Sequence, residues 1–288
     1  MLSEALIETI VAQVLAQLEA QAAPGTAPAP PPEQPFCLRD ITSPQVKDTP
    51  LLAAPQDYDG LLRMKGKTTA RIGVGRAGAR LNTQTLLTLR ADHAIARDAV
   101  FSQVDPALLE RLGLPSFTTR CGDKNIHLTR PDLGREFDPE TLEAITRHCG
   151  KNTDVLILAS DGLSSRAIEA NLADILPILT EGLTARGLKL AKPFFVRFGR
   201  VPAQDHIAEA TGAKVVCTLI GERPGLATAE SMSAYIAYQA TVGMPEARRT
   251  VVSNIHGGGV SAVEAGAYIA ELIAKIAAAK ASGVDLKQ

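Results

Sequence analysis

The amino-acid sequence predicts an α/β protein, in which a mainly parallel β-sheet carries helices on both faces. A small helical domain and a tethered amphipathic helix are expected before the sheet. After residue 140, short apolar segments alternate with helical patterns, which is typical of parallel sheets. The run at residues 215–220 is apolar on both faces, as expected for a strand that is covered on both sides.

Composition limits the class of protein. The chain has 288 residues, 45% of them hydrophobic, which is enough for one large domain or two smaller ones. Its 30 basic and 31 acidic residues give a net charge of -1, so nucleic acid is not an expected partner. The 4 cysteines have no Cys-x-x-Cys spacing, which indicates reduced cytosolic thiols and no zinc or other metal site. The apolar runs are too short for a membrane span, and no secretory signal is visible.

The first 21 residues predict an amphipathic helix. Apolar residues recur at steps of three and four from Leu2 to Leu18, and Glu and Gln side chains occupy the opposite face. Residues 22–42 are rich in proline and alanine and predict an extended linker. Because a short isolated helix is marginal in water, we favour a docking or targeting role over packing against the rest of the chain. The polar face lacks Lys and Arg, which argues against lipid insertion.

Two domains are expected after the linker: a helical domain at residues 43–105 and an α/β domain at residues 106–288. Residues 83–97 form the clearest helix of the first domain. In the second, strands are expected at residues 154–160, 194–198, 214–220 and 249–255, and helices at 140–149, 164–186, 204–211 and 261–281. No type is predicted for residues 233–238.

Four polar loops that contain glycine, serine or charged side chains follow the predicted strands. They are residues 160–164, 199–201, 221–225 and 253–259. Any one of them fits an ordinary turn. The carboxyl ends of parallel strands meet at one edge of a sheet, however, so a shared ligand cleft is favoured over four unrelated turns.

Residues 73–78 match the dinucleotide fingerprint G-x-G-x-x-G, but the context disagrees. The apolar run before them is short, and a helix follows where the second strand of a nucleotide-binding unit should lie. A nicotinamide or flavin enzyme is therefore disfavoured. Arg71, Arg76 and Arg80 around this loop fit an anion or subunit contact as well as they fit a solvated turn.

The usual catalytic patterns are missing, so no catalytic residue is predicted. The sequence lacks the G-x-S-x-G, H-E-x-x-H and phosphate-binding-loop motifs. Its five histidines are scattered, and His256, beside a triple glycine, is the best functional candidate among them. Residues 123–135 combine many charges with apolar anchors, which favours a subunit interface over a catalytic loop.

Nine ordered segments between about residue 68 and the carboxyl terminus together resemble the small (light) subunit of ethanolamine ammonia-lyase. The segments are 75–78 (GRAG), 123–125 (DKN), 128–132 (LTRPD), 160–164 (SDGLS), 193–197 (PFFVR), 199–201 (GRV), 221–226 (GERPGL), 253–256 (SNIH) and 280–283 (KASG). The number of matches and their order make the resemblance specific.

The resemblance implies an adenosylcobalamin-dependent carbon–nitrogen lyase that converts ethanolamine to acetaldehyde and ammonia by a radical mechanism. It implies that residues 106–288 form a Rossmann-like domain that holds base-on cobalamin against a large (heavy) barrel subunit, which carries most of the chemistry. The chain would be active only in that higher-order hetero-oligomer. The alternative is a non-catalytic scaffold or binding module of a multi-subunit complex.

The cobalamin contacts that the resemblance implies fall on Val201, Glu222 and Val251. Glu222 can accept hydrogen bonds from corrin amides, whereas Val201 offers only backbone groups and apolar contact. Val251 departs from relatives that carry cysteine at this position. The D-x-H-x-x-G signature is absent, which agrees with a cofactor that keeps its own dimethylbenzimidazole on cobalt.

The N-terminal helix and its linker resemble, in type and not in sequence, the tails that direct such enzymes into bacterial microcompartments. The resemblance implies a location in the bacterial cytoplasm, inside a microcompartment, with the helix bound to the shell. The alternative is a tail whose helix packs within the oligomer.

Overall fold

The computed structural model describes residues 11–16, 43 and 48–287. The chain divides into two units, Met1–Asp40 and Ile41–Gln288. In the first unit, residues 11–16 are helical. The rest of the helix predicted at residues 1–21, and the whole linker predicted at residues 22–42, lie outside the described residues.

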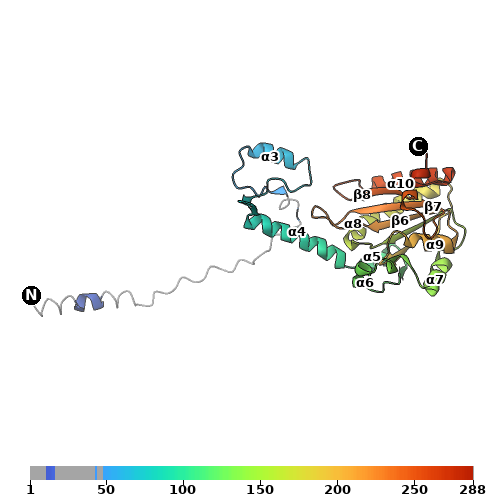
Figure 1. The fold of residues 1–288 in the computed structure, drawn as a ribbon, viewed down its shortest axis with the longest axis horizontal. Coiled ribbons are helices and arrows are strands. Elements are labelled where there is room, and N and C mark those ends of the chain that lie inside the picture. Colours follow the sequence, from blue (N-terminus) through green and yellow to red (C-terminus); the bar gives the residue numbers. More distant parts are fainter. Residues whose placement is uncertain (1–10, 17–42, 44–47, 288) are drawn as a thin grey trace, which may run out of the picture. The chain divides into compact units, whose positions relative to one another are not determined.

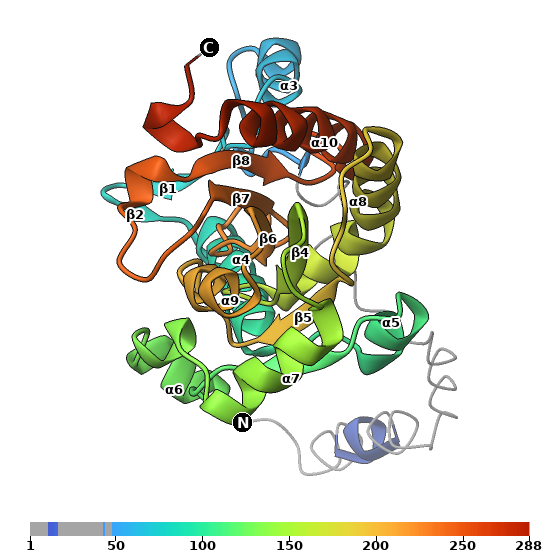
Figure 2. The ribbon, with the colours of Figure 1, turned by 90° about the vertical axis from the view of Figure 1, so that its right-hand side faces the viewer.

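The second unit contains a six-stranded sheet, which has the strand order β3-β5-β4-β6-β7-β8 (Figures 1 and 2). Its strands are β3 (Ser116–Thr118), β4 (Val155–Ser160), β5 (Phe194–Arg197), β6 (Val215–Gly221), β7 (Met232–Tyr238) and β8 (Thr250–Ile255). The first four strands in the spatial order are parallel, and β7 is antiparallel to both of its neighbours. Strand β8 therefore points in the same direction as β3, β4, β5 and β6. The predicted mainly parallel sheet is confirmed.

Helices cover both faces of the sheet, as Figure 2 shows almost end-on. The long helices α8 (Ser165–Ala185) and α10 (Ala262–Ala279) pack against each other over one face. The helices α7 (Pro139–Cys149) and α9 (Ala203–Thr211) pack together over the other face. Each face has its own apolar core, because side chains alternate between the two faces along every strand.

The remaining elements are short apart from α4. They are α3 (Tyr58–Lys65), β1 (Arg76–Ala77), β2 (Arg80–Leu81), α4 (Thr83–Phe101), α5 (Pro106–Arg111), α6 (Lys124–Thr129), and the 3-10 turns η1 (Leu133–Arg135), η2 (Glu246–Arg248) and η3 (Gly283–Asp285). Helix α4 begins where the Asn82 side chain accepts a hydrogen bond from the Thr85 amide, as an N-cap should. No helix in the described part of the chain is long and apolar enough to cross a membrane.

The predicted strands and helices of the α/β domain appear within a few residues of their expected bounds. Two strands were missing from the prediction. Strand β3 has only three residues, and β7 occupies residues 232–238, for which no type was predicted. Both predicted domains, 43–105 and 106–288, fall within the second unit, and the boundary between them stays a prediction.

The fingerprint-like residues 73–78 lie at a hairpin. Strands β1 and β2 pair antiparallel, and Gly78 takes a left-handed conformation with φ of +61° in the turn between them. A dinucleotide fingerprint requires a buried strand that leads straight into a helix, and this geometry differs from it. Nearby, the Arg71 Nε donates to the Asp92 carboxylate on α4 at 2.8 Å, so this arginine anchors the segment to the helix.

Candidate functional site

Four loops meet at one edge of the sheet, as predicted from the strand order. Strands β4, β5, β6 and β8 all end at that edge. Two backbone contacts join neighbouring loops: the Leu163 amide donates to the Gly221 carbonyl at 3.0 Å, and the Phe198 amide donates to the Asp161 carboxylate at 2.7 Å. Beyond β8, Gly258 lines a cavity together with Leu226 of the loop after β6. The loops that follow β4, β5, β6 and β8 therefore lie side by side along this edge.

Glu222 and Val251, two of the three predicted cofactor contacts, lie next to the same tyrosine. Glu222 follows β6 directly, and its carboxylate accepts a hydrogen bond from the Tyr235 hydroxyl at 2.9 Å. On the sheet, Tyr235 pairs with Val251 of β8, so the two side chains lie on the same face. Val251 is 46% exposed. A carboxylate, a tyrosine ring and an exposed apolar side chain thus form one small surface.

Val201, the third predicted contact, lies in the turn between β5 and α9 and is half-buried. It is at the same edge of the sheet, but strand β4 separates β5 from β6. A flat ligand laid along this edge would have to span β4 to reach both Val201 and Glu222.

Tyr235 is absent from the sequence-based site because β7 itself was not predicted. Burial raises the pKa of Tyr235 to about 12, and the negative charge of Glu222 adds to the shift. The hydroxyl therefore stays protonated at neutral pH and acts as a donor to Glu222. If residues 232–238 had been predicted as a strand, the alternation of side chains would have placed Tyr235 on one defined face of the sheet.

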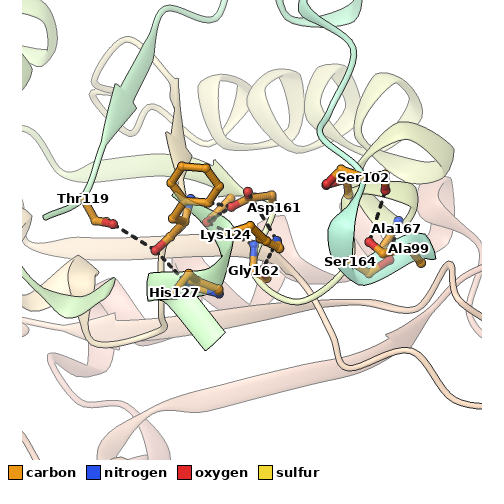
Figure 3. Close-up of polar contacts among 12 residues, drawn as sticks. Ala99, Ser102, Thr119, Lys124, His127, Asp161, Gly162, Ser164 and Ala167 are labelled. Atoms are coloured by element: carbon orange, nitrogen blue, oxygen red, sulfur yellow. Dashed lines mark hydrogen bonds and ion pairs between the residues drawn. The ribbon is translucent and has the colours of Figure 1, made fainter. Parts of the chain in front are cut away.

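A buried set of polar contacts fixes the loop that carries Val201; we call it the Phe198 clamp (Figure 3). Phe198 has a left-handed backbone, with φ of +59°, which is rare for a residue other than glycine. Its amide donates to Asp161, and its carbonyl oxygen accepts from the Thr119 hydroxyl at 3.0 Å and bonds the His127 Nδ1 at 2.9 Å. The Lys124 ammonium lies 3.7 Å from the Asp161 carboxylate and donates to the Gly162 carbonyl at 3.0 Å.

The ionisation states of the Phe198 clamp follow from its burial. Burial raises the pKa of Asp161, and the neighbouring Lys124 charge opposes that shift. Burial lowers the pKa of Lys124, and Asp161 opposes that shift in turn. The pKa of His127 falls to about 4, mainly through burial and also through the charges of Arg200 and Lys124. His127 is therefore neutral, and because a carbonyl only accepts, its proton lies on Nδ1.

This clamp changes the interpretation of residues 123–135, which were predicted to form a subunit interface. Lys124 and His127 are 8% and 0% exposed, and their side chains make contacts inside this chain. The exposed members of the segment include Ile126 and the ion pair between Arg130 and Asp132. Residues 129–132, Asn125 and Arg135 are also exposed, so the segment keeps a surface for another chain and the subunit interface stays a prediction.

His256, the histidine favoured on sequence grounds, has a structural role within its loop. Its Nδ1 accepts from the Gly258 amide at 3.0 Å, and its Nε2 lies 2.8 Å from the Asn254 amide oxygen. Both ring nitrogens are therefore used to shape the loop after β8, and the side chain is only 8% exposed.

Comparison with known proteins identifies the family. The family profile "Ethanolamine ammonia-lyase light chain (EutC)" matches residues 58–287. Proteins named "Ethanolamine ammonia-lyase small subunit" from Clostridium perfringens and Listeria innocua are 57% and 56% identical over 248 residues, which is 86% of this chain and 84% and 85% of those proteins. The protein of that name from Clostridioides difficile is 54% identical over 251 residues, 87% of this chain and 86% of its own. The chain belongs to the ethanolamine ammonia-lyase small-subunit family.

Proposed function

We propose that this chain is the cofactor-holding subunit of an ethanolamine ammonia-lyase. As a member of a family of small subunits, it works in a heterocomplex with a large subunit. The observation that carries the proposal is the surface formed by Glu222, Tyr235 and Val251, which begins with Glu222 at the edge where four loops meet and runs back along the paired strands β7 and β8. Ligands of α/β sheets bind at this kind of edge.

The residues present fit a corrin ring. Amide side chains surround such a ring, and the Glu222 carboxylate accepts hydrogen bonds from amide N–H groups. Val251, which stands where relatives can carry cysteine, offers an exposed apolar contact to the macrocycle. Val201 contributes backbone and methyl contacts from the loop that the Phe198 clamp holds in place.

The chemistry that adenosylcobalamin supplies when bound is homolysis of the cobalt–carbon bond, which provides the radical for the loss of ammonia from ethanolamine. This chain's own part is to bind and orient. Glu222 fixes the edge of the ring, Tyr235 fixes Glu222, and the residues that act on ethanolamine belong to the large subunit. We further propose that the complex is a higher-order hetero-oligomer.

Replacing Glu222 with alanine tests the proposal. In the complex with the large subunit, E222A should weaken cobalamin binding about tenfold to hundredfold, because a hydrogen bond to a charged group contributes about 1.5–3 kcal/mol. The dissociation constant can be followed by the absorbance change on binding. Glu230→Ala, at an exposed carboxylate further along the same loop between β6 and β7, is the control and should leave the constant unchanged.

Two results would overturn the proposal. A wild-type complex that assembles but takes up no cobalamin would contradict a cofactor-holding role. If E222A bound cobalamin as tightly as the wild type and kept full activity, the chain would fit the alternative, a scaffold or binding module without a cofactor contact at this edge.

Tyr235→Phe should produce a smaller effect at the same place. The substitution keeps the ring on the sheet and removes only the hydroxyl that donates to Glu222. We expect binding of cobalamin to weaken about threefold to tenfold, since one hydrogen bond contributes roughly 1 kcal/mol. In the E222A background, Y235F should have no further effect on the constant. Equal losses in both backgrounds would show that Tyr235 acts independently of Glu222.

The N-terminal helix is proposed to dock on a microcompartment shell. The support comes from its amphipathic sequence and the exposure of Val11, Val14 and Leu15 on the described turn. Deletion of residues 1–21 should leave the activity of the complex intact and release it from the shell, as measured by co-sedimentation with purified compartments. Loss of activity in an assembled complex would instead indicate that the helix packs within the oligomer.

A further inference from the structure

A cavity of about 440 Å³ opens beside the same loops. It lies between the C-terminal half of α4 and the loops that follow β4, β5 and β6. Its cationic lining comprises Arg97, Arg200 and Arg223, and its apolar lining includes Phe101, Leu128 and Leu163. The volume is within the range of small-molecule sites, roughly 300–1,000 Å³.

The position of α4 next to these loops is fixed by hydrogen bonds. The Ser165 hydroxyl at the start of α8 donates to the Ser102 carbonyl at 2.7 Å, just after the last turn of α4. Three residues further along, the Asp105 amide donates to the Glu169 carboxylate at 3.0 Å. The wall that carries Arg97 and Phe101 is therefore attached to the strand-end loops, and the cavity has a defined shape.

The three arginines have no carboxylate to balance them. In the part of the chain that the structure describes, none of the three forms an ion pair. Arg200 is held by its Nη2, which donates to the His127 carbonyl at 2.7 Å, while its Nε is buried with no acceptor among the described residues. Burial lowers the pKa of Arg200, and the like charges of Arg135 and Arg223 add to that shift. A buried donor and three positive charges without carboxylate partners in a concave site favour binding of an anion.

We infer that this cavity binds the phosphodiester and the adjoining base of cobalamin's nucleotide arm. The inference rests on the proposed function, because it assigns a second contact region to the same cofactor. Arg200 directly precedes Val201, and Arg223 directly follows Glu222, so two of the three arginines lie on the loops that carry predicted ring contacts. The arm joins one fixed negative charge to a flat apolar base, and the cavity lining combines three guanidinium groups with the apolar side chains of Phe101, Leu128 and Leu163.

A carboxylate of the large subunit is the competing occupant, since it would also satisfy the arginines. Two observations favour the cofactor. Arg200 and Arg223 are each the sequence neighbour of a predicted ring contact, Val201 and Glu222, and the apolar lining suits a flat ring better than a small carboxylate. The two occupants predict different responses to a ligand that lacks the arm.

The experiment compares cyanocobalamin with cyanocobinamide, which keeps the corrin ring and lacks the phosphodiester, ribose and base. Both are titrated against the assembled complex that contains wild-type chain, Arg97→Gln, Arg223→Gln or the double variant. Arg97 and Arg223 are exposed, so their loss should not unfold the chain. Arg90→Gln, at an exposed arginine on α4 outside the cavity, is the matched control.

We expect R97Q and R223Q each to weaken cyanocobalamin binding about tenfold, as for loss of a hydrogen bond to an ionised group, and to leave cyanocobinamide binding unchanged. The assignment would be overturned if the variants weakened the binding of cyanocobalamin and cyanocobinamide equally. It would also be overturned if they changed the binding of neither ligand. Loss of assembly with the large subunit would assign the cavity to the partner's carboxylate and overturn it as well. A wild-type complex that binds neither corrinoid would instead refute the proposed function itself.

Discussion

Replacing Asp161 with alanine should lower the free energy of unfolding by about 3–5 kcal/mol, the usual result of removing one partner of a buried ion pair. The carboxylate is 3% exposed and holds both the Lys124 ammonium and the amide of Phe198. Its loss would leave a buried cation without a counter-ion and a left-handed backbone without its amide contact. Chemical denaturation of the chain measures the change.

Two companion variants separate the charge from the backbone contact. In D161N combined with Lys124→Met, both charges are gone while an acceptor for the Phe198 amide remains, so a large part of the lost stability should return. Asp132→Ala, which breaks the exposed pair with Arg130, should leave stability nearly unchanged. If D161A and D132A had the same free energy of unfolding, the Phe198 clamp would not contribute to the stability of the fold.

Gly221→Ala should disturb both the fold and the site. A Cβ added at Gly221 would lie 2.1 Å from the Ser164 carbonyl oxygen and 2.5 Å from that of Asp161, so backbone would have to move. We expect a loss of about 1–3 kcal/mol, as in overpacked interiors. Since Glu222 is the next residue, its carboxylate should shift and binding of cobalamin to the complex should weaken. Denaturation and corrinoid titration measure the two effects.

The control for this substitution is Gly257→Ala in the loop after β8, where an added Cβ would meet nothing within 4 Å and φ is not left-handed. It should change neither stability nor binding. If G221A and G257A behaved alike, the close packing between the loops after β4 and β6 would have no energetic importance.

The sequence predicted the strands whose apolar runs are long and β-branched, because full burial in a parallel sheet leaves a strong pattern. Strand β6 is the clearest example. Strand β7 was not predicted, since its alternation of Ser, Ala and Tyr is weak, and its antiparallel direction depends on pairing that no local pattern encodes. Strand β3 is too short to leave any pattern.

The site was predictable only in part. The strand-end loops could be located because each follows a strand directly, and Glu222 and Val251 followed from the family resemblance. Tyr235 could not be found without β7. The role of Arg97 depends on the packing of α4 against loops more than sixty residues away in the chain, which no spacing rule reveals. The buried roles of Lys124 and His127 were not predicted, because burial of such residues depends on tertiary packing that the local sequence does not show.

Strand β8 forms one edge of the sheet, and this edge should affect the solubility of the chain when it is produced alone. Val260 bridges to Ile255 at one end of the strand, and the Thr250 hydroxyl accepts from the Gly283 amide at the other. In the described chain, Val251 and Val252 form strand pairs only with β7, and Val251 is exposed. Such a free edge is a template for edge-to-edge aggregation. Synthesis together with the large subunit should therefore give a higher soluble yield than synthesis of this chain alone.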